Sequence, residues 1–297
     1  MNTNWLDFGA GAYAFLGGSN IGGIACGGRA IMVDAGLDRS VSKKALRQLE
    51  TLGARLEALV ITHGHTDHFG GAGWLGERGV PIYAPALEGV FATHPLLEPL
   101  FLYGGAAPIR ELQGKFTLAQ EFVPRIETVT PGALTLAGLE LHLISLPGHA
   151  PAQLGVAYGD VLYCGDVVFP QETLARHPIL FCTDLDAWLE TLAGLPVLPY
   201  THFVPGHGEP VQAIAPLAEA NTARLREIRD QVWEALAEPH ESAAVLRAVA
   251  VHFDVTFAAP QFYLLALTTI HAALTSLQRA GAAAVEMVEN RMVWRRS

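Results

Sequence analysis

The most constraining feature of the sequence is a repeated pattern: a short apolar run is followed at once by a glycine-containing turn that carries histidine or aspartate. The pattern first appears where the apolar run Leu56–Thr62 meets the hexapeptide HGHTDH of residues 63–68. It recurs in the segments Leu146–His149, Cys164–Asp166 and Val204–His207. Short apolar runs bounded by glycine indicate buried strands. Because each polar turn follows a strand, we expect these turns to converge on one edge of a layered sheet.

The composition indicates a folded, soluble and acidic protein. The chain has 297 residues, of which 51% are hydrophobic and 16% are charged, and its formal net charge is -10. It contains no uncharged apolar run of about 18 residues, the length that a membrane-spanning helix needs. The start, Met1–Phe8, lacks the basic and apolar regions of a secretion signal. We therefore expect a cytoplasmic protein with no membrane partner.

Histidine and carboxylate are the side chains available here for binding a metal. The sequence holds 12 histidines against 19 lysines and arginines. Its three cysteines, Cys26, Cys164 and Cys182, lie far apart and form no C-x-x-C pair, which argues against a disulfide framework and a thiolate zinc finger. The acidic balance also disfavours non-specific binding to nucleic acid, because neutralising phosphates requires a surplus of basic residues.

Short strands outnumber helices in the first 210 residues. Apolar runs predict strands over Ala30–Val33, Leu56–Thr62, Pro81–Ala84, Ala133–Leu136, Leu139–Leu146, Leu154–Tyr158, Val161–Cys164 and Phe203–Val204. An amphipathic helix is predicted over Ser40–Leu52 and ends at Gly53. Strands separated by turns rich in glycine and proline are typical of layered sheets rather than of a regular βαβ series, so the predicted fold class is α+β.

Residues 211–297 have a different character and predict a smaller, mainly helical extension to a catalytic domain of residues 1–210. Helices and a terminal β-hairpin are predicted over Leu217–Leu236, Ser242–Phe253, Gln261–Arg279, Ala284–Val288 and Arg291–Trp294. This order is typical of a small winged-helix module. A helical cap with a frayed tail is the alternative interpretation.

The hexapeptide at residues 63–68 concentrates ligands for more than one cation. Alternation along an extended segment places His63 and His65 on the same side, and the turn at Asp67 and His68 presents two further ligands from a second direction. One short loop could therefore serve two adjacent cations. A solvated polar loop is the alternative interpretation, but it gives no reason for the glycines that flank these residues.

These motifs make the sequence resemble the metallo-β-lactamase superfamily over residues 1 to about 210. The signature of the superfamily is HxHxDH, followed by a histidine, an aspartate and a histidine. The matching positions are His63, His65, Asp67, His68, His149, Asp166 and His207. The resemblance implies a four-layer αββα sandwich, which agrees with the many strands predicted from the apolar runs.

The resemblance also implies how these ligands divide between two divalent metal ions. The implied division is His63, His65 and His149 for one metal, Asp67, His68 and His207 for the other, and Asp166 as the bridge. Asp34, in the segment Val33–Gly36, matches a position just behind the first histidines.

The expected chemistry is hydrolysis at a dinuclear centre. Two divalent cations roughly 3.5 to 4 Å apart lower the pKa of a shared water and stabilise charge on the substrate oxygens. Imidazole and carboxylate ligands suit zinc, which is our first choice, and also iron and manganese. Asp67 would bind one metal and accept a hydrogen bond from the attacking water, which makes it the candidate catalytic residue. We therefore expect a hydrolase that uses a metal-bridging hydroxide.

Three functions remain after related enzymes are excluded. The stretch 167–206 leaves no room for the insertion of the β-CASP nucleases. Common zinc β-lactamases have a cysteine at the position of Asp166. Flavodiiron proteins have an added flavin domain that this sequence lacks. The favoured function is hydrolysis of a small ester, thioester or lactone, by similarity to glyoxalase II and to lactonases. The alternatives are a phosphodiesterase or endoribonuclease of the lactamase-like winged-helix type, and a mononuclear-iron enzyme similar to persulfide dioxygenases.

The substrate is expected to be a small molecule held partly by the segment Thr93–Val123. That segment is long and aromatic, so it predicts a lid over the metals, with an ordinary packed connection as the alternative. The candidate substrate contacts are Tyr103, Arg110, Lys115 and Phe169, with Arg110 or Lys115 for a carboxylate and Phe169 for an apolar wall. RNA is disfavoured as a partner because residues 211–297 hold eight basic and nine acidic residues, a net charge of -1. A homodimer is left open.

Overall fold

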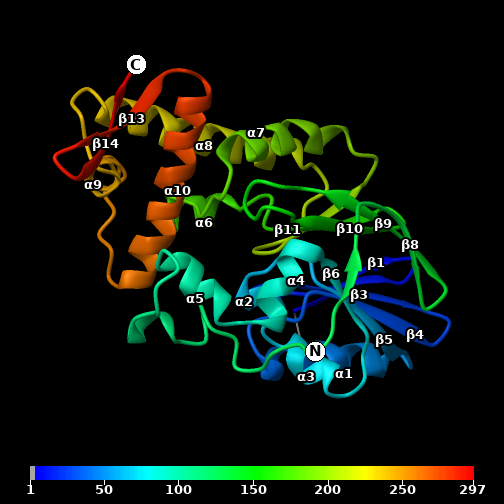
Figure 1. The fold of residues 1–297 in the computed structure, drawn as a ribbon. Coiled ribbons are helices and arrows are strands. Elements are labelled where there is room, and N and C mark those ends of the chain that lie inside the picture. The colour runs from blue at the N-terminus through cyan, green and yellow to red at the C-terminus, as the bar shows by residue number, and fades with distance from the viewer. Residues whose placement is uncertain (1–3) are drawn as a thin grey trace.

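The computed structural model describes residues 4–297 and contains two large β-sheets that face each other, with helices on both outer sides (Figure 1). The first sheet has seven strands in the order of the chain. These are β1 (Trp5–Gly9), β2 (Ala12–Phe15), β3 (Ile21–Cys26), β4 (Arg29–Val33), β5 (Arg55–Val60), β6 (Ile82–Pro85) and β7 (Glu127–Val129). Pairing is antiparallel from β1 to β4 and parallel from β4 to β7.

The second sheet has five strands in the order β12-β11-β10-β9-β8. Their bounds are β8 (Gly132–Leu136), β9 (Leu139–Ser145), β10 (Leu154–Tyr158), β11 (Val161–Gly165) and β12 (His202–Pro205). The pairs are antiparallel except for β11 with β12. The tight turn between β8 and β9 places Ala137 at φ 52° and Gly138 at φ 74°, the left-handed pair that two-residue hairpins favour.

Three apolar cores hold these layers together. Ile31 and Val60 of the first sheet pack with Leu143 and Val156 of the second in the core between the sheets. Helices α1 (Arg39–Thr51) and α3 (Ala72–Gly76) cover the outer face of the first sheet. The side chain of Asp38 caps α1 by accepting hydrogen bonds from the backbone N–H groups at positions 40 and 41.

The outer face of the second sheet is covered by α7 (Leu185–Gly194) and by the C-terminal helices α8 (Ala215–Ala235), α9 (Ser242–His252) and α10 (Pro260–Arg279). Leu162 of the sheet, Leu225 of α8 and Ile270 of α10 belong to one continuous core. The layers therefore run helix, sheet, sheet, helix, and the predicted αββα sandwich of class α+β is confirmed. The chain ends in the hairpin β13 (Ala283–Val288) and β14 (Arg291–Arg296).

The helices and the hairpin of residues 211–297 lie where the sequence predicted them. The hairpin turn places Glu289 at φ 50° and Asn290 at φ 63°, which is the geometry that the Asn-containing turn predicted. A winged helix and a domain boundary at residue 210 stay predictions. Among residues 4–297, no helix combines the length and the apolar character that a membrane crossing requires.

Short elements occur in the connections between the strands and the longer helices. These are α2 (Thr66–Phe69), α4 (Ala86–Thr93), α5 (Leu97–Leu102), the 3-10 turns η1 (Arg110–Leu112) and η2 (Leu195–Val197), and α6 (Gln171–Arg176). Elements α5 and η1 belong to the expected lid segment, and both contact α10 (Figure 1). The segment is therefore anchored on the C-terminal helices at these points.

Candidate metal centre

The four polar turns predicted from the sequence converge at the edge where the two sheets meet. The HGHTDH segment follows β5 of the first sheet, whereas the turns with His149, Asp166 and His207 follow β9, β11 and β12 of the second. Backbone hydrogen bonds join the two sets: the Leu154 N–H donates to the Thr62 carbonyl at 2.9 Å. All seven proposed ligands come together, although their roles as ligands stay a prediction.

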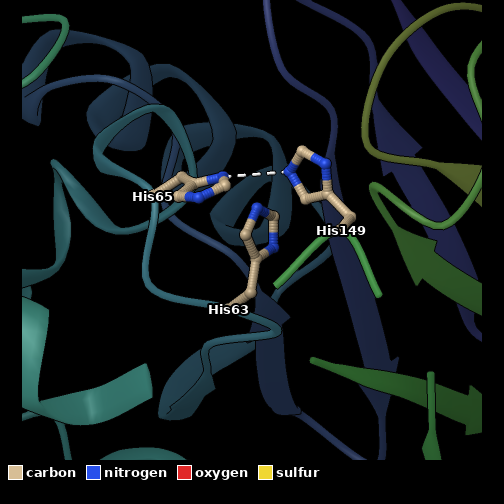
Figure 2. Close-up of side chains that lie close together, drawn as sticks. All are labelled: His63, His65 and His149. Atoms are coloured by element: carbon tan, nitrogen blue, oxygen red, sulfur yellow. Dashed lines mark hydrogen bonds between the residues drawn. The ribbon is translucent and has the colours of Figure 1, made fainter. Parts of the chain in front are cut away.

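Three histidines form the first group (Figure 2). Nδ1 of His65 lies 3.0 Å from Nε2 of His149, and the His63 ring stands beside both, with centroids 4.6 Å and 5.3 Å away. One ring nitrogen from each residue lies within 4.8 Å of the others. Nitrogens from three directions that face one small volume suit a single cation.

The second group consists of Asp67, His68 and His207. Oδ2 of Asp67 lies 3.3 Å from Nε2 of His207 and 3.8 Å from Nε2 of His68. Asp166 stands between the two groups: its Oδ1 lies 3.2 Å from Nε2 of His68, and its Oδ2 lies 3.5 Å from Nε2 of His149 and 3.3 Å from Nε2 of His207. A carboxylate that reaches both groups has the position that a bridge requires.

Buried atoms without a hydrogen-bond partner show that this set fits metal ions. Within the described part of the chain, Nε2 of His63, Nε2 of His68 and Oδ1 of Asp166 are all buried and accept or donate no hydrogen bond. Leaving such a group unsatisfied costs about 1 to 3 kcal/mol. Imidazole nitrogen and carboxylate oxygen are ligands that zinc prefers, so two cations at this place would satisfy all three atoms.

Asp34 holds the first motif from behind, as the resemblance implied for this position. Its Oδ1 accepts from the Thr62 N–H, and its Oδ2 accepts from the Thr62 hydroxyl and from Nδ1 of His68, each at 2.8 Å. The Thr62 hydroxyl also lies 3.0 Å from Nδ1 of His63. These contacts fix the rings so that Nε2 of His63 and of His68 faces the centre.

Backbone carbonyls orient two further ligands in the same way. Nδ1 of His149 donates to the Phe181 carbonyl at 3.0 Å, and Nδ1 of His207 donates to the Gly18 carbonyl at 2.6 Å. Each bond fixes the tautomer that leaves Nε2 free to bind a metal.

Burial and charge divide the histidines into two kinds. Burial holds the pKa of His63 well below its usual value and lowers the pKa of His65 to about 3, so both rings stay neutral with a free lone pair. Burial also lowers the pKa of His207, but the carboxylates of Asp166 and Asp67 outweigh it and raise that pKa to about 10. A proton on His207 thus balances carboxylate charge until a cation replaces it.

Two buried glutamates support the centre, and no sequence pattern indicated them. Glu88 of α4 is 1% exposed, and its carboxylate accepts from the Gly64 N–H at 2.9 Å and from the Ala152 N–H at 2.7 Å. It therefore ties the HGHTDH segment to the turn that carries His149. Glu98 of α5 accepts from the Thr66 hydroxyl at 2.6 Å, and burial raises its pKa to about 8.

The loop between β2 and β3 joins the first sheet to the His207 turn. The Asn20 side chain donates to the carbonyls of Pro205 at 2.9 Å and Gly208 at 2.7 Å, and the Ser19 hydroxyl donates to the Asp67 carbonyl. The only advance signal of this loop is its turn-forming sequence GGSN.

A cavity of about 690 Å³ opens beside the centre and is lined by His65, Asp67, His149, Asp166 and His207. Phe169 lines it too, as the sequence interpretation proposed for an apolar wall.

The other three predicted substrate contacts lie elsewhere. Tyr103 and Arg110 are exposed, and neither is among the residues that line the cavity. The Lys115 ammonium pairs with Oδ2 of Asp38 at 3.2 Å. Substrate binding by these three residues stays a prediction.

Residues 15–207 match the family described as the metallo-beta-lactamase superfamily. The hydroxyacylglutathione hydrolase of Albidiferax ferrireducens is 29% identical over 146 residues, which cover 47% of this chain and 44% of that protein. Hydroxyacylglutathione hydrolase GloC of Haemophilus influenzae is 27% identical over 139 residues, or 43% of this chain and 57% of that protein. The chain thus spans about half the length of the curated relatives it matches.

Solved structures share the fold over almost the whole chain. A beta-lactamase domain protein from Burkholderia ambifaria has a TM-score of 0.74 at 20% identity and covers 99% of this chain and 93% of its own. A metallo-beta-lactamase family protein from Thermus thermophilus has a TM-score of 0.71 at 19% identity, with 99% and 97% covered. The shared fold therefore includes the C-terminal helices.

The fold and the family match define the class of this protein, an αββα sandwich of the metallo-beta-lactamase type. Because the family match spans well over half of the residues, the chain belongs to the metallo-beta-lactamase superfamily.

Proposed function

We propose that the protein is a dinuclear metal-dependent hydrolase that cleaves a small ester, thioester or lactone. The observation that carries this proposal is the position of Asp166, whose two oxygens lie within 3.5 Å of histidines from both ligand groups. When bound, two divalent ions, with zinc as our first choice, would lower the pKa of a shared water and polarise the carbonyl of the substrate. The remaining steps depend on residues of this chain.

Asp67 is the residue that we assign to the attacking water. Its carboxylate lines the cavity and lies 3.3 Å from Nε2 of His207. Burial raises its pKa, but His68 and His207 outweigh burial and lower it to about 2, so the group is ionised at neutral pH. It can therefore orient the water by accepting one of its hydrogen bonds.

The surroundings of the centre favour an acyl substrate over a phosphodiester. Phe169 and Phe181 flank the centre on the cavity side: the Phe169 ring stacks on His207 at 6.0 Å, and the Phe181 ring lies 5.0 Å from the His65 ring. Apolar rings at this place can pack against the hydrocarbon part of an acyl group. The similarity to hydroxyacylglutathione hydrolases, whose name states an acyl substrate, also supports this choice.

A substrate panel tests the proposal directly. The zinc-loaded protein would be assayed with a thioester, an acyl-homoserine lactone, bis-nitrophenyl phosphate and single-stranded RNA. We expect turnover of an acyl substrate and none of the phosphodiesters. Turnover confined to the phosphodiesters would replace the proposal with the nuclease alternative.

The metal content tests the remaining alternative. We expect two metal ions per chain by elemental analysis, and loss of both when Asp166→Ala is combined with His149→Ala. A matched control is His142→Ala, because His142 is exposed on β9 and lies outside the centre. A single iron per chain, with oxygen consumption in place of hydrolysis, would support the mononuclear-iron enzyme.

A further inference from the structure

The cavity beside the metal centre extends to the C-terminal helices, and its far wall is apolar. Phe262, Leu265 and Ala266 on the first turns of α10 line it together with Val255 and Phe257 of the preceding loop. Residues three and four positions apart share one face of a helix, so α10 presents a continuous apolar surface to the cavity. The volume of about 690 Å³ lies within the range of sites that enclose a small organic ligand.

Two phenylalanines leave large apolar surfaces open at this wall. Phe116, from the segment predicted as a lid, is 46% exposed, and Phe262 is 40% exposed. Their ring centroids lie 6.3 Å apart, and both side chains line the cavity. Covering exposed aromatic side chains inside a concave site with an apolar ligand is favourable in proportion to the area removed from water.

One cation lies in the same cavity without a carboxylate partner. Arg176 ends α6, is exposed and lines the cavity next to His177. In residues 4–297, no carboxylate oxygen lies within 4.0 Å of its guanidinium group. A guanidinium in this position can form two parallel hydrogen bonds with a carboxylate or a phosphate.

We propose that this cavity selects amphiphilic acyl substrates: a medium-length apolar acyl chain lies along α10, and Arg176 binds an anionic group on the leaving alcohol or thiol. The inference rests on the proposed hydrolase function and names its substrate class. For a thioester, the acyl C–S bond breaks and the water oxygen forms the new C–O bond. One water proton passes to the thiolate, and the second is lost to solvent from the resulting carboxylic acid.

A chain-length series tests the acyl part. The substrates are thioesters of 3-mercaptopropionate with acetyl, butanoyl, hexanoyl and octanoyl groups. Each buried methylene contributes about fourfold, so we expect kcat/KM to rise steeply from acetyl to octanoyl. Phe262→Ala should flatten this rise, with its largest loss of kcat/KM on the octanoyl thioester. Phe122→Ala is the matched control, because Phe122 is 61% exposed and lies outside the cavity.

The anionic part is tested with matched leaving groups. The substrates are octanoyl thioesters of three thiols: 3-mercaptopropionate, a phosphate-bearing thiol and neutral 2-mercaptoethanol. Their kcat/KM values show whether the protein prefers a leaving group with a carboxylate, with a phosphate or without charge. We expect Arg176→Gln to lower kcat/KM about tenfold for the preferred anion and to lower it much less for the neutral thioester. Arg247→Gln, at an exposed arginine on α9, is the control. An equal loss for charged and neutral thioesters would refute the role of Arg176.

A binding measurement distinguishes a failure of this inference from a failure of the proposed hydrolase function. Calorimetry would measure the dissociation constants of octanoate and butanoate with the full chain, without turnover. We expect octanoate to bind about 100-fold more tightly, and Phe262→Ala to reduce that ratio at least tenfold. Equal binding, with acetyl and octanoyl thioesters hydrolysed alike, would overturn the inference and leave the hydrolase standing. Tight octanoate binding without hydrolysis of any panel substrate would uphold the cavity and reject the hydrolase.

Discussion

The metal centre and the cavity wall beside it differ in how the chain builds them. The ligands stand in turns that directly follow strands. The histidine rings that point at the centre are fixed because they donate hydrogen bonds to the Asp34 carboxylate and to the carbonyls of Phe181 and Gly18. The wall comes from α10 and two loops, and it leaves aromatic surface such as Phe262 uncovered. The comparison teaches that the centre is preorganised for one chemistry, whereas the wall is open to substrates of different shape.

The largest effect should follow from a change at the centre that leaves the wall intact. We expect Asp67→Ala to fold and to lose kcat by about 10³-fold, because general acid–base catalysis typically contributes 10²- to 10⁴-fold. Stopped assays of the preferred thioester, beside a circular dichroism spectrum, measure both properties. Full activity in Asp67→Ala would show that another group activates the water. The chain-length dependence of the residual activity should match that of wild type.

The second-largest effect is expected on metal affinity when Asp34, which holds the metal centre from behind, is substituted. Asp34→Ala removes the acceptor for Nδ1 of His68 and for two groups of Thr62. Losing such a partner of a ligand typically weakens metal binding 10- to 100-fold, which a competition titration with a chelator would measure. Asp34→Asn should retain part of the affinity. Unchanged affinity in Asp34→Ala would mean that the His68 ring is held by packing alone.

Metal affinity should increase with pH, because His207 is protonated in the metal-free protein whereas His63 and His65 are neutral. Carboxylates raise the pKa of His207 to about 10 in the metal-free protein, so a cation must displace its proton at neutral pH. Affinity should therefore rise as pH rises from 7 towards 10, by about tenfold per pH unit for each proton released. Calorimetry in buffers of different ionisation enthalpy would count these protons. Affinity that is independent of pH in this range would contradict the assignment of His207 as a ligand.

The smallest effect is expected at Glu88, which joins the two ligand turns through backbone N–H groups. Glu88→Gln keeps one acceptor and turns the other into a donor, so one buried N–H loses its partner. The free energy of unfolding should fall by about 1 to 3 kcal/mol, as measured with urea. Glu190→Gln, at an exposed position of α7, should change it little. Equal stability of both variants would show that water replaces the lost acceptor.

The comparison also explains what could be predicted from the sequence. Strand β9 alternates apolar and polar residues, and β10 is a short apolar run. The tail helices carry their own periodicity, so the local pattern was sufficient to predict these elements. The convergence of His149, Asp166 and His207 followed because each turn directly follows a strand. The αββα sandwich and the superfamily are confirmed by the structure and the family match.

Other features depend on tertiary contacts that no local pattern encodes. The strands β1 to β3 were not predicted: β2 and β3 contain alanine and glycine in place of larger apolar side chains, and β1 is interrupted by Asp7. Glu88 and Glu98 look like surface residues of short helices until the fold buries them against the centre. The cavity wall was missed for the same reason: the sequence does not show which face of α10 meets the metal side.

The start of α10 lines the cavity and its later turns pack in the core, and this limits which of its positions can be substituted without loss of stability. Phe262 and Leu265 near its start line the cavity, whereas Ile270 and Leu274 further along belong to the core that covers the second sheet. Substitutions at Phe262 and Leu265 can therefore alter the substrate range with little loss of stability. Changes one or two turns later would loosen the whole layer. Within α10, substrate preference can therefore diversify only near the start of the helix, and a library for directed evolution would begin there.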